Sequence, residues 1–283
     1  MKKRILVLGA TGMLGRIVYK YLKTNNSNVI VGSSREKSNP GLIFFDVRKT
    51  NIDNFLSKNR FDFVINCIGA LKGSNKNDLV KLNSLFPKKF DMVCSKLTVN
   101  LIHISTDAVF ADKGTVMSES SKASTYDEYG KSKLDGEVLN GLNIRTSLLG
   151  LDPKEHKGIL ELMLSYKKIK GFTNQIWSGA TTLQVAEFVY WLMSDDNYEN
   201  LIKKTHIIHF APIESITKYR ILETFSELVN GARVIKKRGP KRTRILNTKY
   251  VDEIELKKYT KNLKKALKEL IKFDEKYLTS QKK

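Results

Sequence analysis

The sequence has few of the residues that mark disulfide-bonded, metal-binding or membrane proteins. Its 283 residues include only two cysteines, Cys67 and Cys94, which lack the paired spacing of a metal site or a disulfide framework. No apolar run is long enough to cross a bilayer, and no secretory or lipidation signal is visible. Internal repeats and low-complexity linkers are also lacking. We therefore expect a cytoplasmic globular protein that binds no metal.

Acidic residues are scarce relative to basic ones, which leaves a formal net charge of +21. Residues 232–283 form a basic block that includes the run Lys236-Lys237-Arg238-Gly239-Pro240-Lys241-Arg242. Such a block is typical of contact with nucleic acid or an anionic membrane surface. Because lysine is abundant along the whole chain, we favour solvated lysines, with attraction of an anionic diphosphate substrate as the second interpretation. Nucleic acid is disfavoured, and a homodimer stays open.

The first 25 residues predict a phosphate-binding strand, turn and helix. The apolar run at residues 4–8 is typical of a strand buried on both faces, and residues 13–23 carry apolar side chains at helical spacing. Backbone amides at the start of such a helix can hold a pyrophosphate. The glycine spacing is G-x-x-G-x-x-G, so a purely structural tight turn stays an alternative. We predict that the cofactor contacts Gly9, Thr11, Gly12, Met13 and Leu14.

The same alternation of strands and helices continues to about residue 150. Strand-like segments lie at residues 29–32, 42–45, 63–68 and 100–104, and helix-length amphipathic segments lie between several of them. This pattern predicts an α/β fold with a Rossmann-type doubly wound parallel sheet. Ligands of such sheets bind beyond the carboxyl ends of the strands.

A tyrosine and a lysine four residues apart, Tyr129 and Lys133, would share one face of a helix. The lysine ammonium can stabilise the tyrosinate that remains when the phenol gives up its proton. An exposed helical face is the alternative for an isolated pair of this kind. Its position downstream of Ser105-Thr106-Asp107 and of the glycine loop favours a redox site.

With these motifs the chain resembles an extended short-chain dehydrogenase/reductase, within the group of nucleotide-sugar 4-keto reductases that includes dTDP-4-dehydrorhamnose reductase. The resemblance is good to about residue 150 and patchier beyond it. The matching segments are residues 9–15, Asp46-Val47, 83–87, 103–110, 129–137, 145–147 and 174–182.

The resemblance implies that a reduced nicotinamide cofactor transfers hydride to a sugar C4 ketone, in deoxysugar or surface polysaccharide biosynthesis. Tyr129 would protonate the developing alkoxide, Thr106 would hydrogen-bond the same oxygen, and Lys133 would bind the nicotinamide ribose and lower the tyrosine pKa. The resemblance also implies that Asp46 and Val47 contact the cofactor and that Asp107 contacts the substrate. Prolines expected before the tyrosine are missing, so Tyr126 is a second candidate phenol.

Cofactor preference depends on the residues that follow the second strand. An acid there is typical of NAD sites, whereas an arginine accommodates the 2′-phosphate of NADP. The sequence has two serines followed by Arg35 and Glu36. Arg35 favours NADP(H), and an inward-facing Glu36 would favour NAD(H) instead.

Beyond residue 150 we expect a smaller α/β substrate lobe, residues 151–283, with a helix at 182–193 that returns to the 1–150 domain and a terminal helix at 259–272. Asn174 and Gln175 offer amides for hydroxyl groups or ring edges, and Trp177 offers a flat apolar face. These three residues are candidates for binding the sugar nucleotide. Core packing by Trp177 with surface amides is the alternative.

Two function classes follow from these residues. The first is an NADPH-dependent reductase of a nucleotide-diphosphate sugar. The second is a non-catalytic NADP-binding regulatory subunit of the same fold, because the regulatory subunit of methionine adenosyltransferase resembles these reductases. The complete set of Thr106, Tyr129 and Lys133 favours the reductase.

Overall fold

The structure is a computed structural model that describes residues 2–25, 27–111, 114–152, 156 and 158–275. The chain divides into two compact units, and each is described by itself. The first unit comprises residues 1–111, 122–145 and 186–208, and the second comprises 112–121, 146–185 and 209–283. Both units are therefore discontinuous in the sequence. The sequence pattern predicts a boundary near residue 150 and a helix at 182–193 that returns to the first domain.

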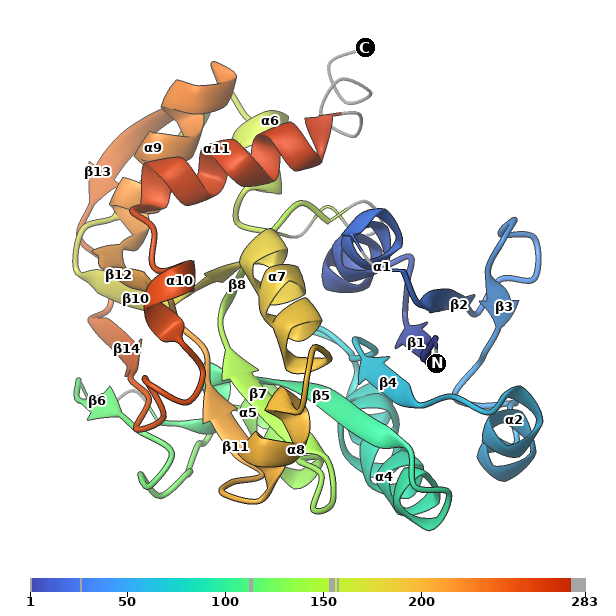
Figure 1. Cartoon of the computed structure of the whole chain (residues 1–283). Coiled ribbons are helices and arrows are strands. Elements are labelled where there is room, and N and C mark those ends of the chain that lie inside the picture. The colour runs from blue at the N-terminus through green and yellow to red at the C-terminus, as the bar shows by residue number, and fades with distance from the viewer. Residues whose placement is uncertain (1, 26, 112–113, 153–155, 157, 276–283) are drawn as a thin grey trace. The chain divides into compact units, whose positions relative to one another are not determined.

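The first unit is built on a seven-stranded parallel sheet in the order β11-β7-β5-β4-β1-β2-β3, which can be followed in Figure 1. The described strands of this sheet are β1 (Arg4–Leu8), β2 (Val29–Ser34), β3 (Ile43–Phe44), β4 (Phe63–Asn66), β5 (Asn100–Thr106), β7 (Leu142–Thr146) and β11 (Ile207–His209). The prediction of an α/β Rossmann-type doubly wound sheet is confirmed.

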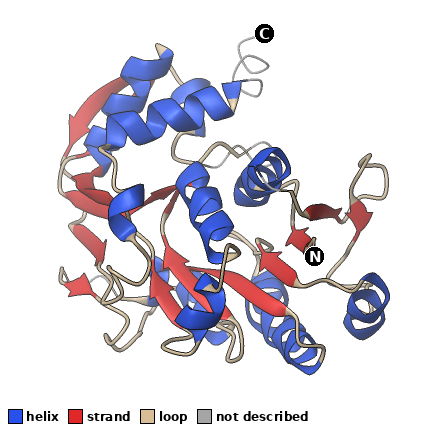
Figure 2. Cartoon of the chain, in the orientation of Figure 1, coloured by secondary structure: helices blue, strands red, loops and turns tan. Residues whose placement is uncertain are grey.

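Helices connect these strands, as the alternation of blue and red elements in Figure 2 shows. The helical segments that belong to the first unit are α1 (Met13–Asn25), α2 (Ile52–Asn59), α3 (Lys76–Asp78), the π-helical turn η1 (Leu79–Leu85), α4 (Phe86–Lys96), the 3₁₀ turn η2 (Asp107–Val109), α5 (Glu128–Asp135) and α8 (Asn197–Ile202). Helix α7 (Thr182–Leu192) runs from the second unit into the first, because the unit boundary lies between residues 185 and 186.

The close packing of α1 against the strand before it depends on one glycine of the loop. A Cβ at Gly15 would lie 2.2 Å from the carbonyl oxygen of Gly9, so only glycine fits there without a shift of the backbone. Leu14, Ile17, Val18 and Leu22 are buried and repeat at helical spacing. The strand Arg4–Leu8 is buried from residue 5 onward, as expected for a central strand covered on both faces.

The second unit contains a five-stranded sheet with the order β12-β10-β14-β6, in which β8 also pairs with β10, and a separate parallel pair, β13 and β9. Its described elements are β6 (Val116–Met117), β8 (Leu148–Leu149), α6 (Glu161–Ser165), β9 (Lys168–Phe172), β10 (Gln175–Thr181), β12 (Ile213–Thr217), α9 (Lys218–Val229), β13 (Arg233–Lys237), β14 (Arg242–Leu246), α10 (Leu256–Tyr259) and α11 (Leu263–Phe273).

The predicted terminal helix at 259–272 corresponds to α11, which begins four residues later, at Leu263, and ends at Phe273. A short separate helix, α10, lies before it. Helix α10 ends at Tyr259, and Asn262 starts α11 by accepting a hydrogen bond from the Lys265 amide with its side chain. The amide oxygen of an N-cap asparagine satisfies a helix-start N–H, which explains the new start. Among the described residues, no helix is long and apolar enough to cross a membrane.

Candidate active site

The glycine loop presents a helix start suited to a phosphate group. The Gly9 amide donates to Ser33 Oγ at 3.3 Å, and the Ala10 amide donates to the Ser33 carbonyl at 3.0 Å. These bonds tie the loop to the end of the neighbouring strand β2. The first turn of α1 has no acidic residue, and a Cβ at Gly12 would meet only the Gly9 carbonyl, at 3.5 Å, among the described residues. Space and positive helix-dipole potential are thus both present for a pyrophosphate.

The residues after β2 are arranged around a buried serine. Ser34 Oγ accepts hydrogen bonds from the Glu36 amide at 3.0 Å and from Asn39 Nδ2 at 2.6 Å. Asn39 Nδ2 also lies 3.4 Å from Glu36 Oε2, so the carboxylate is directed at Asn39. The Arg35 side chain is exposed. Contact of Arg35 with the 2′-phosphate of NADP stays a prediction.

Asp46 and Val47 follow β3 and are half-buried. Asp46 Oδ1 accepts the Arg48 amide at 2.8 Å, and its own amide donates to Thr50 Oγ1 at 3.0 Å. The Arg48 side chain forms an exposed ion pair with Asp78. Both predicted cofactor residues therefore lie in a hydrogen-bonded turn beyond the carboxyl end of a strand, the edge at which doubly wound sheets bind ligands.

Helix α5 reaches the carboxyl end of β5 because Gly130 lets two backbones approach closely. A Cβ at Gly130 would lie 2.1 Å from the carbonyl oxygen of Ala108 in η2. Thr106 precedes η2, and its Oγ1 accepts the Ala108 amide at 3.2 Å and donates to Asp107 Oδ1 at 3.2 Å. A side-chain hydrogen bond joins Thr106 to Tyr129. The structure thus brings the predicted threonine and tyrosine into direct contact.

The phenol of Tyr129 stays protonated at neutral pH. Burial, together with the negative charges of Asp107 and Asp127, raises its pKa to about 12. The hydrogen bond between Tyr129 and Thr106 acts in the opposite direction and lowers the pKa. A protonated phenol is the form that can act as an acid.

Lys133 is buried, and its ammonium group is directed at β5. Nζ donates to the Ile104 carbonyl at 2.7 Å and lies 3.4 Å from Nε2 of His103. Burial lowers the pKa of Lys133 to about 8, while the charge of Glu137 opposes this shift. The predicted effect of Lys133 on the pKa of Tyr129 is not among the causes of the tyrosine shift, so that role stays a prediction.

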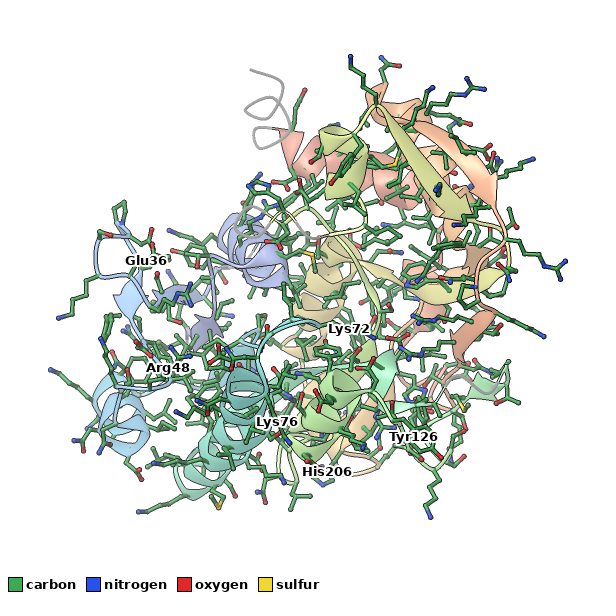
Figure 3. The ribbon with its side chains drawn as sticks, turned by 180° about the vertical axis from the view of Figure 1, so that it is seen from behind. Glu36, Arg48, Lys72, Lys76, Tyr126 and His206 are labelled. Carbon is green, nitrogen blue, oxygen red and sulfur yellow. The ribbon has the colours of Figure 1, made fainter. Side chains whose placement is uncertain are left out.

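The second candidate phenol, Tyr126, differs sharply from Tyr129 in its surroundings. Its side chain is 89% exposed, and it is labelled in Figure 3 on the segment before α5. Tyr129 is half-buried and hydrogen-bonded to Thr106. These contacts favour Tyr129 as the acid.

Two further buried residues of the site, His103 beside Lys133 and Asn66 beside His103, are not among the residues that the sequence predicts. His103 Nδ1 lies 3.0 Å from Asn66 Nδ2, and its other ring nitrogen faces Lys133. The available signal was a histidine inside the apolar strand segment that leads to Thr106. A polar ring in such a strand needs buried partners.

The three predicted substrate residues of the second unit form contacts within that unit. Asn174 forms two hydrogen bonds with Gly239. Its Nδ2 donates to the Gly239 carbonyl at 2.6 Å, and its Oδ1 accepts the Gly239 amide at 2.9 Å. Gln175 Nε2 donates to the Pro240 carbonyl at 3.1 Å. Trp177 is 7% exposed, and its Nε1 donates to Ser147 Oγ at 2.8 Å. Substrate binding by these residues stays a prediction, and the burial of Trp177 favours the packing alternative.

We expect Trp177→Phe to lower the free energy of unfolding by about 1–3 kcal/mol, because the variant loses the bond to Ser147 and part of the ring volume. Urea unfolding measures this change, with Tyr166→Phe as a control because Tyr166 is 60% exposed. A raised KM for a sugar nucleotide at unchanged stability would instead place the indole at the substrate.

The chain matches the model of the RmlD substrate binding domain family over residues 2–271. The chain belongs to this family. Among curated relatives of this RmlD-family chain, the methionine adenosyltransferase 2 subunit beta of Xenopus tropicalis is 29% identical over 143 residues, which cover 48% of this chain and 42% of the relative. The match therefore spans less than half the length of that relative.

Solved structures share the fold of the RmlD-family chain over nearly its whole length. A dTDP-4-dehydrorhamnose reductase from Clostridium acetobutylicum has a TM-score of 0.77 at 22% identity and covers 95% of this chain and 98% of its own. The dTDP-4-dehydrorhamnose reductase of Bacillus anthracis, solved in complex with NADP, has a TM-score of 0.77 at 17% identity and covers 95% of this chain and 99% of its own. At these identities the likeness establishes the fold.

Proposed function

We propose that the protein is an NADPH-dependent reductase that converts the C4 ketone of a nucleotide-diphosphate 4-keto-6-deoxysugar to an alcohol. The observation that carries this proposal is the contact of a protonated Tyr129 with Thr106, with Lys133 buried four residues along the same helix. An acid that donates to a developing alkoxide needs this protonation state. The family and the fold support the same chemistry.

A bound nicotinamide cofactor would supply the hydride, and the residues of the first unit would do the rest. The helix start at Gly12 and Met13 would hold the pyrophosphate through backbone amides. Tyr129 would give its phenolic proton to the oxygen of the reduced carbonyl, and the Thr106 hydroxyl would hydrogen-bond the same oxygen. Lys133 would bind the nicotinamide ribose and stabilise the phenolate that remains. Preorganised donors at the site where charge develops lower the barrier because they need no reorientation during the reaction.

We expect Arg35→Ala to weaken NADPH about tenfold to a hundredfold and to spare NADH. The exposed guanidinium would otherwise form a charge-assisted contact with the 2′-phosphate, worth about 1.5–3 kcal/mol. Fluorescence titration with both cofactors measures the effect, and Glu36→Ala is the matched control on the neighbouring residue. Equal losses for both cofactors would contradict the preference for NADP(H).

A second candidate function is that of a cofactor-binding regulatory subunit without turnover. The observation that favours it is the 29% identity with the methionine adenosyltransferase 2 subunit beta. In this case the site would bind NADP, and the bound protein would regulate the activity of a partner enzyme. The protein would then bind cofactor normally and oxidise none of it with any keto-sugar.

The deciding experiment incubates the purified protein with NADPH and a panel of dTDP-, UDP- and GDP-linked 4-keto-6-deoxysugars. Loss of the absorbance of the reduced cofactor, with formation of the reduced sugar nucleotide in equal amount, is the result expected for the reductase. Tight binding of NADPH without consumption across the panel would contradict the reductase and support the subunit.

A further inference from the structure

Lys133 lies at the end of a chain of buried polar groups that begins at a backbone amide. The Ile68 amide lies 3.1 Å from Asn66 Oδ1, Asn66 Nδ2 lies 3.0 Å from His103 Nδ1, and His103 Nε2 lies 3.4 Å from Lys133 Nζ. The side chains of Asn66, His103 and Lys133 are 1%, 0% and 5% exposed. All four residues belong to the first unit.

The polarity of this chain is fixed at its backbone end. A peptide N–H can only donate, so the side-chain oxygen of Asn66 must face the Ile68 amide. The NH₂ group of Asn66 then faces His103 Nδ1, which must accept. A neutral imidazole has one donor and one acceptor nitrogen, so an accepting Nδ1 leaves the proton on Nε2. Burial holds the pKa of His103 well below its usual range, which keeps the ring neutral.

The Nε2–H bond of His103 is therefore directed at Lys133. An ammonium group has no lone pair and would present a second donor to this N–H, whereas an amine can accept it and still donate to the Ile104 carbonyl. We propose that Asn66 and His103 are positioning residues that lock the imidazole as its Nε2–H tautomer and favour the amine form of Lys133. The exchangeable proton of Lys133 then lies on the side away from His103.

The other charged and titratable groups near Lys133 do not determine its protonation state in place of His103. Glu137 raises the pKa of Lys133, but its carboxylate is shared by Arg145 and Ser105. Cys67 is a buried thiol whose own pKa is raised to about 12, so it is uncharged at neutral pH. Within the described residues, no carboxylate forms an ion pair with Lys133. A positive charge on Lys133 is therefore stabilised by the Ile104 carbonyl and not by His103.

The role of this arrangement in catalysis rests on the proposed reductase function. Each reduction leaves Tyr129 without its proton, which must be restored before the next turnover. A lysine with a pKa of about 8 holds and releases a proton near neutral pH, the condition for efficient proton transfer. A permanently charged lysine could stabilise the tyrosinate but could not exchange its proton readily.

The tautomer is measured directly in the unaltered protein by long-range ¹H–¹⁵N NMR of the imidazole rings, without cofactor. We expect His103 to show a protonated Nε2 and a bare Nδ1, with the signal assigned by its loss in His103→Leu. A protonated Nδ1, or a charged ring at neutral pH, would overturn the proposal.

Asn66→Asp reverses the polarity of the chain with almost no change in shape. A carboxylate can only accept, so it would take the Ile68 N–H and also the proton of His103 Nδ1. We expect His103 to switch to the Nδ1–H tautomer in this variant. An unchanged Nε2–H tautomer would show that Asn66 does not control the ring.

The effect on Lys133 is tested by its pKa, followed through the side-chain Cε resonance and assigned with Lys133→Met. We expect His103→Leu to raise this pKa by about 0.5–1 unit, the size of one neutral hydrogen-bond contribution. If His103 instead accepted a proton from the ammonium, its removal would lower the pKa. A fall or no change therefore overturns the proposal, and the exposed His206 gives a control variant, His206→Leu, that leaves the value unchanged.

In the active enzyme the alkaline limb of the kcat profile should move to higher pH in His103→Leu by the same amount. The NMR measurements need no turnover, so they decide the proposal even if the keto-sugar panel gives no activity. A confirmed tautomer with an inactive protein would leave this inference standing and reject the reductase.

Discussion

Replacement of Tyr129 by phenylalanine is expected to lower kcat for the keto-sugar by about 10²–10⁴-fold, the usual loss when a positioned general acid is removed. The variant lacks only the hydroxyl, so the ring still fills its half-buried position and the cofactor site at the glycine loop is untouched. NADPH affinity should therefore stay nearly unchanged. Steady-state kinetics and cofactor titration on the same preparation separate the two effects.

Tyr126→Phe is the matched control for this prediction, because Tyr126 lies three residues earlier and is almost fully exposed. We expect the control to keep wild-type kcat. A Tyr129→Phe enzyme with near wild-type activity would reject Tyr129 as the acid, and a large loss in Tyr126→Phe would assign the role to that phenol. A fall in NADPH affinity in Tyr129→Phe would indicate a disturbed fold rather than lost chemistry.

The sheet could be predicted because its central strands have local sequence patterns that indicate buried strands. The apolar run at residues 4–8, the glycines after it and the apolar spacing of α1 define one strand-turn-helix unit, and the structure has β1 and α1 at almost the predicted bounds. Buried parallel strands have this run-like pattern because both of their faces are covered.

The placement of the lysine side chain could not be predicted from spacing. The interval of four residues puts Tyr129 and Lys133 on one helical face, but it does not say which neighbour Lys133 contacts. That choice depends on the Ile104 carbonyl and on His103, which are about 30 residues away in the sequence. Tertiary contacts of this kind have no local pattern.

The amides of the second unit show the same limit. Asn174 and Gln175 are candidates because amides suit a sugar or a base. The sequence cannot show that the backbone carbonyls of Gly239 and Pro240, 65 residues later, accept hydrogen bonds from these amides. Buried amide groups take backbone partners wherever these are in reach. Contact of these amides with a sugar nucleotide stays a prediction, and in the structure they bond the backbone of Gly239 and Pro240.

The second large effect is expected at the buried ion pair of Glu137 and Arg145. Arg145 donates through Nε and Nη2 to the two carboxylate oxygens, each at 2.7 Å, and Ser105 Oγ donates to Oε1 at 2.7 Å. The two side chains are only 4% and 10% exposed, and the guanidinium lies 5.2 Å from the ring centre of Phe110. Removal of one partner leaves a buried charge without compensation. We expect Arg145→Met to lower the free energy of unfolding by about 3–5 kcal/mol.

The control for Arg145→Met is an exposed pair in the same unit, Arg48 with Asp78. Exposed pairs contribute about 0–1 kcal/mol, so Arg48→Met should change the urea midpoint little. The double variant Glu137→Met with Arg145→Met should recover most of the loss, since apolar replacement of a buried pair is often close to neutral. A double variant as unstable as Arg145→Met would show that packing, not the unpaired carboxylate, determines the loss. Because Ser105 precedes Thr106 directly, restored stability without restored activity would show that this pair also holds the end of β5 in place for Thr106 and Tyr129.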